Sequence, residues 1–154
     1  MVALVLVAVP AFGGPYEDGQ AAYELNDYKT ALEHWRPLAE QGDASAQYKL
    51  GFMYRYGEGV PKDYAEARKW YLKAAEQGNA WARLGLAGLY GRGKGVPEDL
   101  VLAYMWWNLA AATNDRVPAD LGRDSRNLFS ELMTSEQIAK AQRMTREWLA
   151  RHQQ

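Results

Sequence analysis

The chain contains no cysteine among its 154 residues. Disulfide bonds, thiolate nucleophiles and cysteine-ligated zinc are therefore excluded. A cysteine-free protein functions in oxidising and reducing compartments alike, so this absence does not indicate where the protein works. Histidine is almost as scarce: His34 and His152 fall on different expected elements, and neither has a carboxylate at ligand spacing. We therefore expect no metal site and no cofactor.

The sequence also lacks an excess of charge of either sign. Its 18 Lys and Arg are balanced by 19 Asp and Glu, which gives a formal net charge of -1. Binding to a phosphate backbone calls for a clustered basic surplus, so we expect no nucleic-acid partner. Hydrophobic residues make up 48% of the chain, with 6 Trp and 10 Tyr. This content is enough for the core of one compact domain.

Long hydrophobic runs are missing except at the start, where residues 1–12 carry no charge. A helix needs about 20 apolar residues to cross a bilayer, so this run predicts no stable membrane span. Its length is typical of the apolar region of a signal peptide, although no Lys or Arg precedes it. We expect export to the periplasm or secretion. The alternative is a cytoplasmic protein with this segment packed on its body, and in both cases residues 1–13 stand outside the fold.

A 36-residue repeat is the strongest pattern in the chain. When residue n is set beside residue n+36, a dozen positions are identical in one gapless alignment. Such matches, including tryptophan, glycine and proline, indicate stacked copies of one structural unit. The identical pairs include Ala46 with Ala82, Leu50 with Leu86, Tyr54 with Tyr90, Gly57 with Gly93, Gly59 with Gly95, Val60 with Val96, Pro61 with Pro97, Asp63 with Asp99, Ala67 with Ala103, Trp70 with Trp106, Ala74 with Ala110 and Ala75 with Ala111.

Each unit is predicted to be a hairpin of two helices. In the middle unit the first helix has an apolar stripe and runs into glycines, and Asp63 then begins the second helix as an N-cap. Alanines let the two helices approach closely, and tryptophans fill the space between hairpins. A weaker copy begins at Asp27, and the loss of the match before it predicts a shorter connection in the first hairpin. In that copy His34 takes the position of Trp70, which predicts partial burial.

The predicted organisation is therefore a repeat array over 14–117, in units 14–43, 44–79 and 80–117, closed by capping helices over 118–154. We expect one helix from Pro118 to Met133 and another over about 135–151, with Thr134 and Gln137 forming a capping box between them. The apolar residues predicted to serve packing are Leu121, Leu128, Phe129 and Leu132 in the first helix and Ile138, Ala141, Trp148 and Leu149 in the second.

The middle unit resembles a Sel1-like repeat of the tetratricopeptide-related superfamily, as found in bacterial proteins. The residues that carry the resemblance are Leu50, Gly51, Tyr54, Gly57, Gly59, Asp63, Ala67, Trp70, Ala74 and Gly78, followed one repeat later by Leu86, Tyr90, Gly93, Gly95, Asp99, Ala103, Trp106 and Ala110. The next copy departs at Ala87, where the family has glycine. The resemblance covers roughly 18–151 and implies an all-α, right-handed superhelical solenoid of antiparallel helix hairpins.

The resemblance also implies a non-catalytic scaffold that binds a protein or peptide, and we expect a monomer. Two alternatives remain: an envelope hydrolase, since some cysteine-rich relatives are linked to β-lactam hydrolysis, and a permanent structural subunit of an envelope complex. The Ser-x-x-Lys arrangement of that hydrolytic chemistry is absent from the sequence.

Residues that the repeat leaves unexplained are the candidates for partner binding. They lie on the first helix of each hairpin, opposite the packing stripe, and they are aromatic residues and arginines, the types enriched at binding hot spots. The competing interpretation is that they pack against the caps or the N-terminal segment. The candidates are Tyr48, Phe52, Arg55, Tyr56, Trp81 and Arg83.

Overall fold

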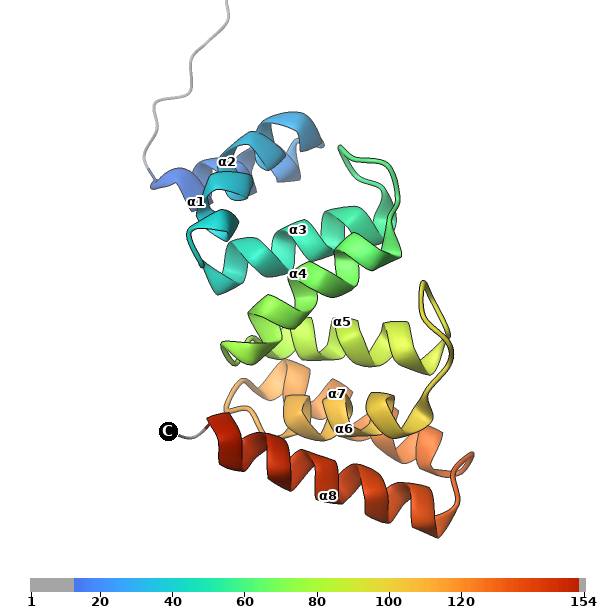
Figure 1. The fold of residues 1–154 in the computed structure, drawn as a ribbon. Helices are drawn as coiled ribbons and strands as arrows, with labels where there is room; N and C mark the ends of the chain where they lie inside the picture. The colour runs from blue at the N-terminus through green and yellow to red at the C-terminus, as the bar shows by residue number, and fades with distance from the viewer. Residues whose placement is uncertain (1–12, 153–154) are drawn as a thin grey trace, which may run out of the picture.

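The computed structural model describes residues 13–152, and this part of the chain consists of eight helices and no strand (Figure 1). The predicted all-α fold is confirmed. The helices are α1 (Pro15–Glu24), α2 (Tyr28–Glu40), α3 (Ala44–Tyr56), α4 (Tyr64–Glu76), α5 (Ala80–Gly91), α6 (Leu100–Ala111), α7 (Arg116–Ser130) and α8 (Ser135–His152).

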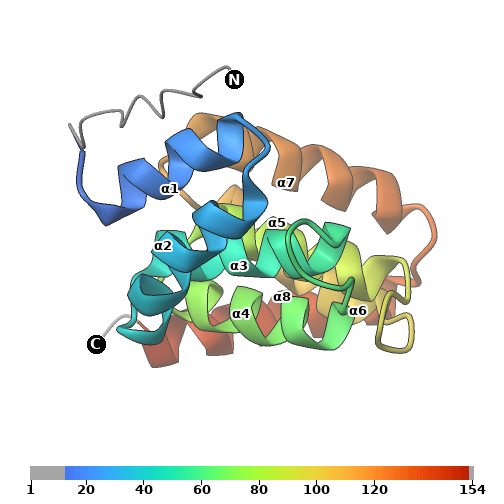
Figure 2. The same ribbon diagram turned by 90° about the horizontal axis from the view of Figure 1, so that it is seen from above.

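Consecutive helices pack as antiparallel hairpins that stack along one direction. α1 packs on α2, α3 on α4 and α5 on α6, while α6 also supports both α7 and α8. The odd-numbered helices α3, α5 and α7 contact one another in sequence and so form one continuous face. Seen from above, α1 and α7 lie on one side of the stack and α4 and α8 on the other (Figure 2). We call the side that carries α3, α5 and α7 the inner face.

The signature residues form the interior, as the repeat predicts. Their alanines, leucines and tryptophans are buried in two clusters, one around Trp35 and Trp70 and one around Trp106, Trp107 and Trp148. Gly51 is needed for the close approach of α3 to α4, because a Cβ atom there would lie 2.5 Å from the Tyr71 ring.

Two repeat-phased glycines explain the long loops of the second and third hairpins. Gly59 and Gly95 have φ values of 71° and 68°, which favour glycine. A side chain at Gly59 would collide with Tyr28, and one at Gly95 would collide with Tyr64. Because Tyr28 and Tyr64 are themselves one repeat apart, each loop rests on the first residue of the preceding hairpin's second helix. The shorter first connection is also confirmed, since only residues 25–27 join α1 to α2.

Helix starts follow the same period. The predicted cap Asp63 accepts hydrogen bonds from the backbone N–H groups of Ala65 and Glu66, and Asp99 accepts one from Leu102. The Thr134 and Gln137 capping box forms in both directions. A second series begins the inner-face helices at 43, 79 and 115, where Asp43 and Asn79 cap their helices but Asp115 makes no side-chain cap bond.

This difference gives a matched test of capping. We expect Asp43→Ala to lower the free energy of unfolding by about 1 kcal/mol, because the N–H of Ala46 loses its 2.7 Å bond to the carboxylate. Asp115→Ala removes a side chain that makes no such bond. Its effect should stay within about 0.5 kcal/mol in urea denaturation. Equal losses in the two variants would contradict the cap assignment.

The C-terminal helices differ from the prediction in their packing. α7 begins at Arg116, and the predicted packing of Leu121, Leu128 and Leu132 is wrong, because these side chains are 45%, 65% and 69% exposed. α7 instead buries its small residues, and a Cβ at Gly122 would lie 2.8 Å from the Trp107 carbonyl oxygen. In α8, Ala141 and Trp148 are buried as predicted. On α2, His34 is half-buried, as its place in the repeat predicts.

Candidate binding groove

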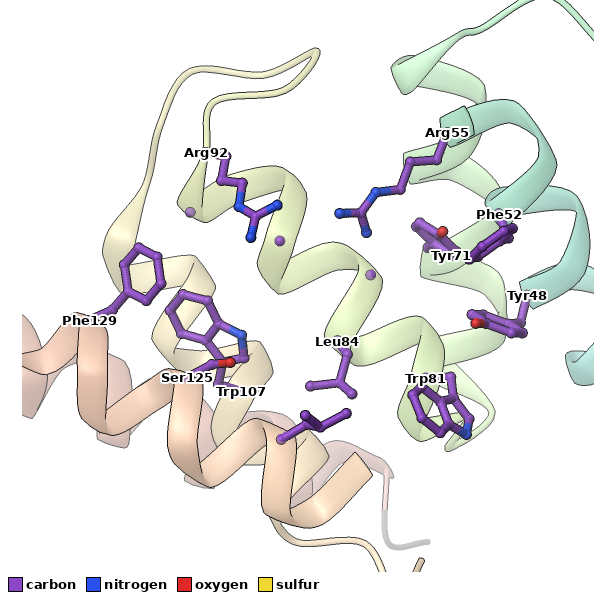
Figure 3. A pocket seen from close by; sticks show the side chains of 14 residues that line it. Tyr48, Phe52, Arg55, Tyr71, Trp81, Leu84, Arg92, Trp107, Ser125 and Phe129 are labelled. Atoms are coloured by element: carbon purple, nitrogen blue, oxygen red, sulfur yellow. The ribbon is translucent and has the colours of Figure 1, made fainter. Parts of the chain in front are cut away.

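An open groove of about 310 Å³ crosses the inner face (Figure 3). Tyr48 and Phe52 of α3, with Tyr71 of α4, form one wall, and Trp107 and Phe129 form the opposite wall. α5 runs along the floor, and the groove therefore spans all three inner-face helices.

The groove is open because α5 carries glycines between Leu84 and Arg92 on its inner side. Gly85, Gly88 and Gly91 recur every three residues there and line the groove. One repeat earlier, α3 has Lys49, Phe52 and Arg55 at these positions. The missing side chains at Gly85 and Gly91 make room for the Tyr71 and Trp107 rings of the walls, and the missing side chain at Gly88 leaves the floor open between them.

The walls are held by aromatic packing. Tyr48 stacks on Tyr71 with ring centroids 6.0 Å apart, and Phe52 contacts Tyr48 at 6.2 Å. On the other side Trp107 and Phe129 lie 4.6 Å apart. Burial raises the pKa values of the Tyr48 and Tyr71 phenols, and for Tyr71 the Arg55 guanidinium offsets only part of that rise. Both phenols are therefore neutral near pH 7 and add no negative charge to the groove.

Basic side chains mark the end of the groove nearest the interhelical loops. Figure 3 shows Arg55 of α3 and Arg92 at the end of α5 with their guanidinium groups turned toward each other above α5. The same two arginines line an adjoining hollow of about 170 Å³, together with Lys62 and Lys94. Within residues 13–152, no acidic side chain lines either hollow.

The structure brings five of the six predicted residues together. Tyr48, Phe52, Arg55 and Trp81 line the groove. Tyr56 lies at its rim, 49% exposed, and packs on Phe52 with ring centroids 4.5 Å apart. Their placement matches the predicted inner surface, whereas a role in partner binding stays a prediction.

Arg83 does not lie on this surface, and its predicted placement is wrong. Its side chain is 8% exposed and points between hairpins, where it donates to the carbonyl oxygens of Ala75 at 3.3 Å and Leu109 at 2.9 Å. The guanidinium also lies 4.9 Å from the centre of the Trp148 ring. Burial lowers the pKa of Arg83, and its hydrogen bonds join the ends of α4 and α6.

Arg83 has a counterpart one repeat earlier. Gln47 is buried and donates to the carbonyl oxygen of Ala39 at 3.0 Å, as Arg83 does to that of Ala75. These two residues form a repeat-phased clamp between successive hairpins. The sequence predicts Arg83 on the surface because it follows Trp81 on the first helix of its hairpin and because arginine is enriched at binding hot spots.

Most residues that line the groove were not predicted from the sequence. The signal for its floor was present in the three glycines at a spacing of three, and Leu84 lies one repeat after Tyr48. The far wall had no comparable signal, because its residues come from a helix outside the repeat and from a tryptophan assigned to the core. The missed lining residues are Tyr71, Leu84, Gly85, Gly88, Gly91, Arg92, Trp107, Leu121, Ser125 and Phe129.

Two of the floor glycines make a sharp prediction about stability. A Cβ at Gly85 would lie 2.7 Å from the buried Tyr71 ring, whereas a Cβ at Gly88 would meet only the flexible end of Arg55 at 3.3 Å. We expect Gly85→Ala to destabilise the fold by about 1–3 kcal/mol through overpacking. Gly88→Ala should stabilise it by about 0.5–1 kcal/mol, because alanine is the better helix former.

Urea denaturation of the two variants checks this prediction. A stabilised Gly85→Ala variant, or a clearly destabilised Gly88→Ala variant, would contradict the description of the floor.

Within residues 13–152, no group of three histidine, aspartate or glutamate residues is arranged to hold a metal ion. A search of the same residues finds no helix with the length and apolar character needed to cross a membrane.

Comparison with known proteins identifies the repeats. The Sel1 repeat family matches residues 13–43, 44–79 and 82–115. The solved structure of c5321, a protective antigen of uropathogenic Escherichia coli with an SLR fold, is similar at 30% identity and a TM-score of 0.83 over 90% of this chain. A Sel1 repeat protein from Oxalobacter formigenes is similar at 35% identity and a TM-score of 0.60 over 64% of this chain.

The chain spans 30% of the length of the first of these proteins and 39% of the second. Among proteins of curated function, none matches it. Sel1 repeats are generally non-catalytic scaffolds that mediate protein–protein interaction. With three matched repeats stacked as hairpins around the predicted signature, this chain belongs to the Sel1 repeat family.

Proposed function

We propose that this protein is a scaffold that holds an extended segment of a partner protein in the inner-face groove. The observation that carries the proposal is the groove itself, a hollow of about 310 Å³ with two aromatic walls and an open glycine floor. Pockets that anchor side chains of a partner are typically lined by aromatic and apolar residues with a few polar groups. The groove is formed within one chain, so the proposal requires only a monomer.

The glycine floor favours an extended segment over a bulkier element. A floor that is open at Gly88 allows the backbone of a ligand to lie close to α5 there, while its side chains contact Tyr48 and Phe52 on one wall and Trp107 and Phe129 on the other. Recognition of extended segments in aromatic-lined grooves is a recurring binding mode. The walls are packed within the fold, so little ordering would be needed on binding.

A matched pair of leucines tests the proposed site. Leu84 lines the groove, whereas Leu72 is 39% exposed on α4 and lies outside it. A photoreactive amino acid replacing Leu84 should crosslink a discrete protein in an extract of the native host, and the same group at Leu72 should not. Equal crosslinking from both positions, or none from position 84, would contradict the proposal.

Export to the bacterial envelope is the second part of the proposed function. It is supported by the uncharged apolar run over residues 1–12, which lies outside the described residues. Removal of about the first 13 residues is expected if this run serves as a signal peptide. The mass of the N-terminal peptide of the protein isolated from its host provides the test. A retained Met1 would count against export.

A further inference from the structure

The cationic side chains at one end of the groove indicate the charge of its ligand. We propose that the groove binds an extended protein segment in which an apolar or aromatic side chain is followed or preceded by a run of acidic residues. This inference rests on the proposed function and adds a ligand class to it.

The two hollows provide a continuous path. The larger one, of about 310 Å³, and the smaller one, of about 170 Å³, share Arg55 and Arg92 as lining residues. A segment that leaves the larger hollow between these arginines enters the smaller one, where it meets Lys62 and Lys94. Four cationic side chains therefore lie along the path, in two successive pairs.

Within residues 13–152, no acidic side chain lines the two hollows beside these cations. In the described part of the chain, the ion pairs involve Lys69, Arg116 and Arg123, all outside the two hollows. Glu58, in the loop between α3 and α4, accepts a 2.6 Å hydrogen bond from the Tyr23 hydroxyl. The protein as a whole has a formal net charge of -1, so this basic cluster is a local feature. Charge complementarity at such a cluster selects an acidic ligand.

Arginine suits the proposed contacts. Guanidinium groups donate two parallel hydrogen bonds to a carboxylate, and such charge-assisted bonds are stronger than neutral ones. Arg55 also lies 5.3 Å from the centre of the Tyr56 ring, an arrangement that helps to hold its guanidinium in place.

The other end of the groove requires an apolar side chain. Trp81 and Leu84 lie at that end, away from the arginines (Figure 3), and Leu121 also lines the groove. Trp81 and Leu121 are 38% and 45% exposed, so each has apolar surface to bury on binding. An aromatic or large aliphatic residue next to the acidic run would bury this surface.

Other occupants fit less well. Residues 1–12 carry no charge and would leave all four cations without a partner. A single C-terminal carboxylate would satisfy the arginine pair but not Lys62 and Lys94. A nucleic acid would need a basic surface that extends beyond these four residues.

Selection from a displayed random peptide library on the full-length protein tests the inference. We expect the enriched peptides to contain acidic residues next to an aromatic or aliphatic residue, away from a free C-terminus. Arg55→Ala and Arg92→Ala should each weaken the best peptide about tenfold, as expected for loss of one charge-assisted contact. Arg143→Ala removes an exposed arginine on α8, far from the groove, and should change the affinity less than about twofold.

A charge reversal controls for misfolding. Arg92→Glu should weaken the acidic peptide and prefer one of the variant peptides in which a single acidic residue is replaced by lysine, because Arg55, Lys62 and Lys94 still face the remaining acidic residues. Recovery of this kind requires a folded groove. Failure of every single-lysine peptide to recover binding to an otherwise folded Arg92→Glu variant would overturn the inference.

The remaining outcomes separate the inference from the proposed function. Enriched peptides that lack acidic residues but lose binding in the Gly88→Phe variant would overturn only the inference. Peptides that require a free C-terminus, or tighter binding of a single-stranded oligonucleotide, would also overturn it. A library from which no peptide is enriched would count against both.

Discussion

Replacing Gly88 by phenylalanine is expected to weaken ligand binding at the inner face by about a hundredfold or more, equivalent to roughly 3 kcal/mol. Gly88 lies on the floor of the groove, one repeat after Phe52, so the substitution restores the side chain that the preceding hairpin has at this position. The new ring would occupy the space between the two aromatic walls. A ligand held there has no other route across α5.

The fold itself should tolerate this change. The nearest atoms to a Cβ at Gly88 belong to the flexible Arg55 guanidinium, at 3.3 Å and beyond. Phenylalanine is also a better helix former than glycine by about 0.4 kcal/mol. Stability should therefore stay at or slightly above that of the wild type while binding is lost.

Titration of the selected acidic peptide and urea denaturation, performed on the same samples, measure the two effects. Gly88→Ala is the matched control, because it raises the helix propensity at this position with little loss of groove volume. Unimpaired peptide binding by a stable Gly88→Phe variant would show that the ligand binds elsewhere.

Replacing Arg83 by alanine is expected to have the largest effect on stability, a loss of about 3 kcal/mol. The substitution leaves the carbonyl oxygens of Ala75 and Leu109 without the donors that now lie at 3.3 Å and 2.9 Å. It also opens a space beside Trp148, whose ring the guanidinium contacts. Arg83 thus joins three helices, α4, α6 and α8, to α5.

Gln47→Ala provides the comparison one repeat earlier. Gln47 is neutral, donates a hydrogen bond to Ala39 and accepts one of 2.8 Å from the Gln77 amide, so its loss should cost about 1–2 kcal/mol. Both free energies follow from urea denaturation. The folded Arg83→Ala variant should bind the peptide normally, because Arg83 does not line the groove. An Arg83→Ala variant with unchanged stability and lost peptide binding would instead support the prediction that Arg83 lies on the binding surface.

The repeat made most of the fold predictable. The helix caps, the loop glycines and the buried alanines and tryptophans all recur every 36 residues. Aligning the chain with itself at this offset therefore predicts the hairpins and their order. Asp63 shows why: its side chain must accept backbone N–H groups at a helix start, and that requirement recurs in every copy. Features repeated for such local reasons can be recognised without knowledge of the neighbours.

Features that depend on neighbouring elements were less predictable. The polar partners of Arg83 lie at the ends of two other helices, and its sequence position does not reveal them. The leucines of α7 have helical spacing, yet α7 packs on α6 through Gly122 and Ala119, which leaves Leu128 exposed. The groove arises where α5 departs from the repeat. Comparing identical positions between repeats therefore does not predict it.

The six tryptophans offer the most direct test of the binding site. Trp81 and Trp107 line the groove, whereas Trp35, Trp70, Trp106 and Trp148 do not. Each indole N–H gives its own signal in a proton–nitrogen NMR spectrum, and single Trp→Phe variants assign them. On titration with the selected acidic peptide, the signals of Trp81 and Trp107 should shift and the other four should stay in place. Shifts confined to Trp70 or Trp148, with Trp81 and Trp107 unchanged, would place the ligand away from the inner face and contradict the account.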